Sequence, residues 1–208
     1  MIIFLIFIIN GYFISRLIEK DKSNLAHIVL FSLGTMGLIS FLDIFIWNSL
    51  SLLGVLILDI PFISAISAIV IYNKRKLIAP IEYNYSDFFV LGILFLFASQ
   101  QFYGEWDAWA MWNTKAEFLM SQHWKQLFSP ELYWMHADYP LLLPSIIAGG
   151  WSALGINSPW IPFFVGLLFS WSTYLLLKDG ITRLYNKTYG ILGALFIIVS
   201  LINLLLAV

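Results

Sequence analysis

The sequence predicts an all-α, polytopic membrane protein with about six transmembrane helices and two interfacial, juxtamembrane helices in an outer-face loop. Composition is the first observation behind this prediction. Of the 208 residues, 61% are hydrophobic and 11% charged, with a mean hydropathy of +0.86, whereas soluble globular domains have about 25% charged residues. The other two observations are the recurrence of long apolar runs and the gathering of nine of the eleven basic residues in three places.

The apolar runs set the number of spans. A transmembrane helix requires about 20 mostly apolar residues. Runs close to this length predict spans at 1–18, 25–46, 50–72, 87–102, 160–177 and 189–208.

The basic residues set the predicted orientation. They gather at 16–22, at 74–76 and at 178–187, and the positive-inside rule assigns such groups to the cytoplasm. The segment 103–158 then lies on the outer face, provided that the apolar stretch 139–155 does not cross. With about fifteen apolar residues and Pro144 inside, this stretch fits an interfacial or re-entrant helix. We therefore expect a multi-pass protein of the plasma (inner) membrane with its active region outside.

Tryptophans mark the start of the outer loop. If 105–119 is helical, Trp106, Trp109 and Trp112 share one face. That pattern is typical of a helix anchored at the headgroup level. The alternative role for one of these rings is to stack on a sugar.

Two acids, Glu105 and Asp107, follow the fourth apolar run directly. A carboxylate at that depth costs free energy unless it is paired with a cation, hydrated or part of a functional site. Together they are candidate ligands for a divalent cation such as Mg²⁺ or Mn²⁺. Alternatively one of them is a general base, or both are ordinary solvated charges at the membrane boundary.

A second candidate stretch is HADYPLLLP, residues 136–144. His136 is a candidate for phosphate binding or proton transfer. Asp138 is a candidate for substrate binding, or for the N-cap of a helix that has Pro140 in its first turn.

Other function classes receive less support. The chain has no cysteine and no P-loop, HExxH, GxSxG or dinucleotide motif, and its composition argues against nucleic-acid binding. Asp43 and Asp59 fall within predicted spans, where acids are functional candidates. They support the alternative of a small non-enzymatic transporter or an accessory subunit of an envelope-polysaccharide synthase.

Three stretches carry a family resemblance: GEWDAW at 104–109, DYPLLLPSIIAGGWSALG at 138–155, and the apolar segment 158–198 with its LYNK turn. In order and spacing they resemble the front part of the C-type membrane glycosyltransferases. The nearest members are bacterial lipid-linked sugar transferases related to protein O-mannosyltransferases and lipid A aminoarabinose transferases. Asp107 matches the essential acid of the family's loop, and Tyr139-Pro140 matches its proline motif.

The resemblance implies a division of the chain. Residues 1–86 would be an N-terminal three-helix membrane block, and 87–208 a glycosyltransferase-like core, incomplete at its C-terminus. The sequence departs from the family pattern at Ala108, where a second acid often stands, and at Tyr139, where the family has His or Lys. The chain alone is therefore expected to need further segments or a membrane protein partner for activity.

The resemblance also implies a reaction, namely transfer of a sugar from a polyprenyl-phosphate donor to an acceptor on the outer face. Asp107 would take the acceptor's proton, with Glu105 beside it as a second acid or metal ligand. Lys115, Lys125 and His136 would supply positive charge for the leaving phosphate, together with further segments or a metal held by Glu105 and Asp107. Trp106, Trp109 and Tyr139 would line the sugar pocket.

Overall fold

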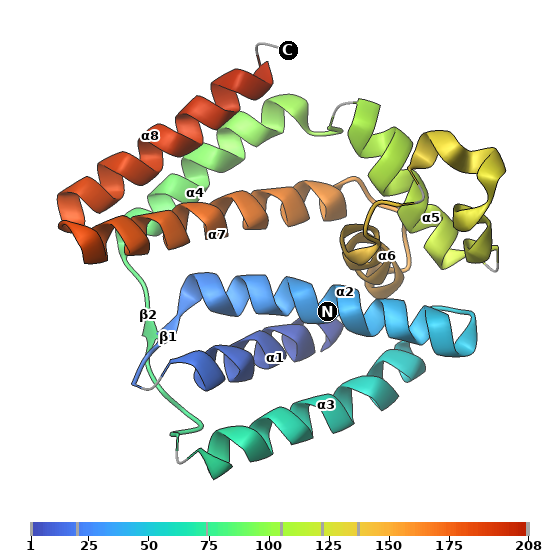
Figure 1. The fold of residues 1–208 in the computed structure, drawn as a ribbon, viewed down its shortest axis with the longest axis horizontal. Coiled ribbons are helices and arrows are strands. Elements are labelled where there is room, and N and C mark those ends of the chain that lie inside the picture. The colour runs from blue at the N-terminus through green and yellow to red at the C-terminus, as the bar shows by residue number, and fades with distance from the viewer. Residues whose placement is uncertain are drawn as a thin grey trace.

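Six helices run roughly lengthwise through the molecule, and their connections alternate between its two ends (Figure 1). They are α1 (Ile2–Ile18), α2 (Leu25–Trp47), α3 (Leu52–Tyr72), α4 (Tyr85–Ala98), α7 (Trp160–Leu184) and α8 (Lys187–Leu206). The computed structural model describes residues 2–206 except 20, 74, 105, 122 and 137, and no side chain at 2, 133, 135 or 200–206. Each predicted span coincides with one of these helices.

The all-α prediction is confirmed for the described residues, where the only strands are the two-residue β1 (Ser23–Asn24) and β2 (Ile81–Glu82). Helices α2, α3 and α7 are long and apolar enough to cross a membrane. Helix α1 and the described part of α8 are apolar but shorter. The chain is therefore a membrane protein by the length and composition of these helices.

Polar residues between the apolar runs fix where the helices begin. The side chains of Asn24 and Ser51 accept hydrogen bonds from backbone amides in the first turns of α2 and α3. Helix α4 begins with a reciprocal capping box between Asn84 and Asp87. Asp87 also pairs with Lys178 of α7 at 2.5 Å, so one carboxylate both starts α4 and joins it to its neighbour.

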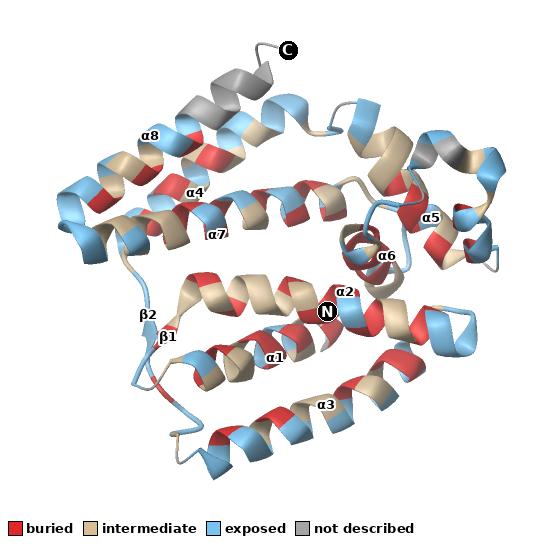
Figure 2. Ribbon diagram, in the orientation of Figure 1, coloured by how far each residue is buried: buried red, intermediate tan, exposed pale blue. Residues whose placement is uncertain are grey.

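Helix α6 (Leu142–Leu154) lies across the others and is seen nearly end-on in Figure 1. It packs against α2, α5 (Thr114–Met120) and α7. All of its residues from Pro144 to Trp151 are buried (Figure 2). This crosswise helix occupies the stretch for which the sequence predicts an interfacial or re-entrant helix.

The predicted N-cap of this helix is wrong. Helix α6 begins two residues after Pro140, its N-cap is Leu141, and no side chain caps it. A proline disfavours helical backbone in the residue before it, so the turn containing Asp138 and Tyr139 stays outside the helix. Pro144 instead occupies the first turn, where a missing N–H costs nothing.

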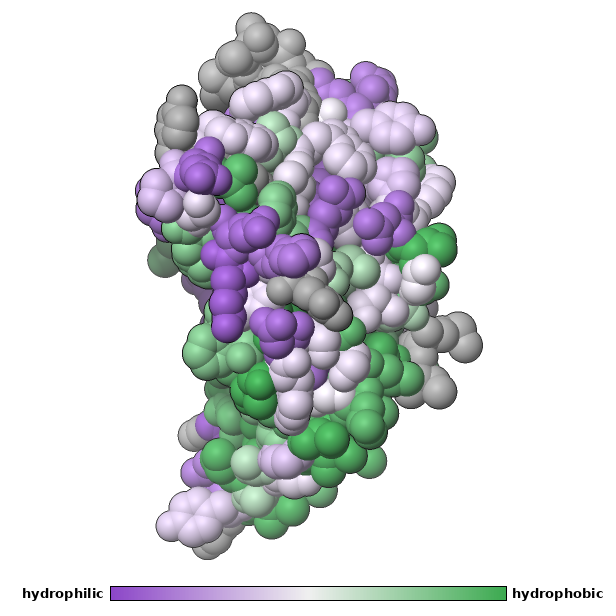
Figure 3. Space-filling model, turned by 90° about the vertical axis from the view of Figure 1, so that its right-hand side faces the viewer, coloured by the Kyte–Doolittle hydropathy of each residue, from purple (hydrophilic) through white to green (hydrophobic). Residues whose placement is uncertain are grey.

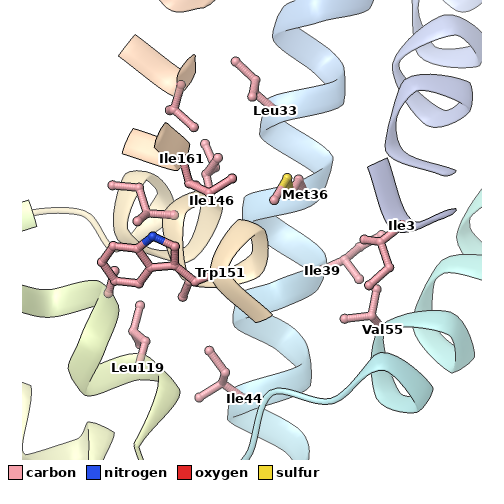
Figure 4. Packing of buried hydrophobic residues seen from close by; sticks show 14 of the residues in the cluster. Ile3, Leu33, Met36, Ile39, Ile44, Val55, Leu119, Ile146, Trp151 and Ile161 are labelled. Carbon is pink, nitrogen blue, oxygen red and sulfur yellow. The ribbon is translucent and has the colours of Figure 1, made fainter. Parts of the chain in front are cut away.

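The main apolar core surrounds α6. Trp151 and Ile146 of α6 lie in one cluster with Met36 of α2 and Leu119 of α5, and on the other side of α2 Ile39 points toward Ile3 of α1 and Val55 of α3 (Figure 4). The Trp151 indole N–H donates to the Ser158 carbonyl at 2.8 Å, which pairs its one polar group. A second core joins α4, α7 and α8 around Trp171 and Tyr174. Helix α6 is therefore a buried helix against which the preceding segment packs.

The two ends of the molecule differ in chemistry. The short connections after α1, α3 and α7 meet at one end, where β1 and β2 pair in parallel and Lys22 contacts Glu82 at 3.1 Å (Figure 1). We call this the basic end, because the three basic groups at 16–22, 74–76 and 178–187 adjoin these connections in the sequence. The opposite end, the loop end, carries residues 99–141 and the α2–α3 turn. Hydrophilic side chains gather on it above a hydrophobic lower part (Figure 3).

Candidate functional site

The loop end is built from short helical pieces. The turn η1 (Ser99–Gln101) extends α4, and a π-helix, η2 (Ala108–Asn113), runs directly into α5. Two 3₁₀ segments, η3 (Trp124–Phe128) and η4 (Pro130–Met135), lead back to α6. Of the site residues predicted from the sequence, Trp109 lies on η2 and Lys115 on α5, and the others lie in the stretches that flank these pieces.

The tryptophans of this segment do not share one exposed face. The π-helix widens the turn to an i→i+5 pattern, so residues three apart point in different directions. Trp106 is 72% exposed, the Trp109 indole N–H donates to the Tyr103 carbonyl, and Trp112 stacks on Tyr139. The three rings therefore have three different surroundings.

Five residues from two separate stretches form what we call the lysine–aromatic cluster: Trp112, Lys115, His136, Asp138 and Tyr139. The Lys115 side chain is fully buried, and its ammonium donates to the His136 carbonyl at 2.6 Å. Its Nζ lies 5.7 Å from the centre of the Trp112 ring and 5.5 Å from that of Tyr139. Contacts of this length are attractive cation–π interactions.

The Tyr139 ring contacts two other rings. It stacks on Trp112 with a centroid separation of 5.7 Å and on His136 with a separation of 4.7 Å. His136 has a left-handed backbone with φ of 52°, and its carbonyl also accepts from the Tyr139 N–H at 3.0 Å. A tight turn thus holds the His136 and Tyr139 rings together while 37% of Tyr139 stays exposed.

Burial lowers the pKa of Lys115 from its ordinary value, and the negative charge of Asp138 partly opposes this shift. Desolvation disfavours the charged amine, which explains the direction. The cluster therefore contains a cation held by one carbonyl, two aromatic faces and a nearby carboxylate.

The structure thus unites four of the predicted substrate-binding residues: Lys115, His136, Asp138 and Tyr139. The other two, Trp106 and Trp109, lie earlier in the loop. Asp107 is exposed at the start of η2, and none of the described interactions joins it to the cluster. Glu105, the second predicted acid, lies outside the described residues.

The predicted metal site at Glu105 and Asp107 stays a prediction, because Glu105 lies outside the described residues. Among the described residues, no group of three or more acids or histidines is close enough to hold a metal ion. Mg²⁺ and Mn²⁺ need several oxygen ligands, and Asp107 supplies one residue of such a set.

An apolar cavity adjoins the cluster. It has a volume of about 390 Å³ and lies between α2 and the stretch that leads into α6. Gly37, Leu38 and Phe41 line its α2 side, and Tyr139 and Pro140 line the other. Tyr139 therefore faces both the lysine–aromatic cluster and an apolar groove.

Sequence reasoning missed Asn113. This residue is 2% exposed, and its side-chain oxygen has no hydrogen-bond partner among the described residues. It closes the π-helix and lines a second cavity, between α4 and α7. The available signal was an amide residue flanked by Trp112 and Lys115, but helical periodicity alone does not predict a π-helix.

The two acids within the helices have structural partners. Asp43 accepts the Ser51 N–H at 2.6 Å and so helps to fix the α2–α3 turn. Asp59 of α3 accepts a hydrogen bond from the Asn10 amide of α1. Both carboxylates are buried.

Comparison of the chain with family models, with curated proteins and with solved structures finds no match.

Proposed function

We propose that this chain is, or forms part of, a membrane glycosyltransferase that moves a sugar from a polyprenyl-phosphate donor to an acceptor. The observation that supports this most is the lysine–aromatic cluster. It combines a partly exposed tyrosine, a buried cation and an adjoining apolar cavity. A sugar-phosphate lipid offers matching parts, namely a ring that stacks on an aromatic face, an anionic phosphate and a hydrocarbon chain.

The proposed topology has six crossings, by α1, α2, α3, α4, α7 and α8. Their connections alternate between the basic end and the loop end (Figure 1). The positive-inside rule then puts the basic end in the cytoplasm and the loop end outside the plasma membrane. In this arrangement α6 lies in the outward-facing part of the protein and packs against α5 and η2, which carry Lys115 and Trp112 of the cluster.

In the proposed reaction the acceptor's hydroxyl or amine attacks the anomeric carbon of the donor sugar. Asp107 takes the proton, which suits an exposed carboxylate at the start of the loop. The bond between the anomeric carbon and the phosphate oxygen breaks, and polyprenyl phosphate leaves with the bonding electrons.

The cluster has a positioning role in this scheme. Because Lys115 is fully buried and bonded to a carbonyl, it orients the His136–Tyr139 turn rather than touching the phosphate. His136 is exposed, and its imidazole is the group proposed to bind the phosphate. The buried Lys115 ammonium, which lies close to the Tyr139 ring, also stabilises the negative charge that develops on the leaving phosphate.

The test is transfer of radiolabelled sugar from polyprenyl-phosphate donors in membranes that contain the chain. We expect wild type to transfer label and Asp107→Asn to reduce the rate at least 100-fold, since general-base catalysis contributes about 10²–10⁴. Glu117→Gln, which changes an exposed acid on neighbouring α5, is the matched control and should retain the rate. Equal rates for Asp107→Asn and wild type would exclude Asp107 as the base.

The transporter alternative depends on Asp59, the acid buried against Asn10 between α1 and α3. It predicts that Asp59→Asn abolishes function while Asp107→Asn does not. The transferase proposal predicts the reverse, so the same two variants separate the classes.

A further inference from the structure

A second cavity lies away from the lysine–aromatic cluster, between α4, α7 and η2. Its volume is about 280 Å³, and its walls are mostly apolar, with Leu94, Phe97, Phe102, Phe163 and Leu167 among them. No member of the lysine–aromatic cluster lines it. The cavity is therefore a separate feature of the loop end.

One wall of this cavity carries an unsatisfied polar group. Asn113 is almost completely buried, yet its side-chain oxygen accepts no hydrogen bond from any residue that the structure describes. It does not cap α5 either, although it stands at the N-cap position. Leaving such an acceptor unpaired costs free energy, which a ligand with a hydrogen-bond donor would recover.

The π-helix explains how Asn113 comes to face this cavity. Ala108 and Asn113, the two ends of η2, both line it. A regular α-helix over the same residues would rotate Asn113 relative to Ala108. π-helical turns are rare and occur often at functional sites.

The other walls define the class of ligand. Among the described residues, no charged side chain lines the cavity, so the ligand is held by apolar contact and hydrogen bonding. Phe97, which is 43% exposed, lies both on the cavity wall and on the apolar surface of α4. The volume is slightly below the range of about 300–1,000 Å³ for small-molecule pockets, which suits a single hydrocarbon chain.

We propose that this cavity binds one chain of a membrane lipid whose headgroup donates a hydrogen bond to the Asn113 side-chain oxygen. The site lies where α4 ends and the loop begins. A lipid bound there would have its chain beside the helices and its headgroup beside η2. Binding does not depend on sugar transfer.

The test is native mass spectrometry of the purified protein with phosphatidylethanolamine and phosphatidylcholine that carry identical acyl chains. The two headgroups have the same net charge, but only ethanolamine offers N–H donors. We expect wild type to retain phosphatidylethanolamine about 3- to 10-fold better, the effect of one net hydrogen bond. Asn113→Leu should abolish this preference. Equal retention of both lipids by wild type, or an unchanged preference in Asn113→Leu, would overturn the proposal.

A second pair of variants tests the cavity itself. Gly166 of α7 lines the cavity, and a Cβ there meets nothing within 4 Å, so Gly166→Leu projects into the space. Gly180 of the same helix also has free space but does not line the cavity. Gly166→Leu should lower retention of both lipids, whereas Gly180→Leu should not. Undiminished retention in Gly166→Leu would likewise refute the site.

Discussion

Lys115 is buried, and no carboxylate of the described part of the chain is in hydrogen-bonding contact with it, so its charge costs stability that packing must offset. Because burial lowers its pKa below 10.5, the unfolded chain binds this proton more tightly than the folded one. Stability is thus predicted to rise with pH between the lowered pKa and 10.5. Lys115→Met should remove that rise and leave the melting temperature at pH 7 equal or higher, since the His136 carbonyl keeps its bond from Tyr139.

Thermal unfolding followed by circular dichroism from pH 7 to about 10 measures this effect. Lys125→Met is the control, because Lys125 is exposed and its loss should keep the rise. A rise that persists in Lys115→Met would assign the pH dependence to another group.

At this scale the sequence predicts which residue types carry chemistry but not their partners. Lys115 and Tyr139 meet only because the chain turns back over α5, and their contact spans 24 positions of the sequence. The Asp138 cap fails for a local reason, the restriction that Pro140 imposes on the residue before it.

At the scale of elements, the α2–α3 hairpin depends on a close approach at Gly54. A Cβ there would lie 1.6 Å from the Asp43 carboxylate, which itself holds the Ser51 amide. Gly54→Ala should therefore lower the free energy of unfolding by about 1–3 kcal/mol, the usual cost of overpacking. Gly34→Ala in α2 meets nothing within 4 Å and should be neutral or stabilising, because alanine favours a helix. Urea or thermal unfolding of the two variants in detergent compares them, and equal stabilities would contradict the tight approach.

Helices are the best predicted features of this chain, since apolar length and polar caps such as Asn84 are local signals. The π-helix is the main exception. Its residues, AWAMWN, have no local feature that excludes an α-helix, and the cavity beside Asn113 exists only after α4 and α7 pack. Tertiary packing rather than sequence periodicity thus determines this part of the site.

At the scale of the whole molecule, the separation of the basic end from the loop end makes the orientation testable. The chain lacks cysteine, so a single cysteine introduced at any exposed position reports the side on which that position lies. Gln126 is exposed at the loop end, and Lys76 and Asn186 are exposed at the basic end.

A membrane-impermeant maleimide applied to intact cells should label Gln126→Cys, and should label Lys76→Cys and Asn186→Cys only after permeabilisation. This result follows if α4 and α7 cross and α6 does not, because Lys76 and Asn186 then share a side and Gln126 lies on the other. If α6 also crossed, Asn186→Cys would be labelled in intact cells and Lys76→Cys would not. Labelling of Lys76→Cys but not of Gln126→Cys in intact cells would show the reverse orientation. The lysine–aromatic cluster would then lie in the cytoplasm, which would contradict the proposal of sugar transfer on the outer face.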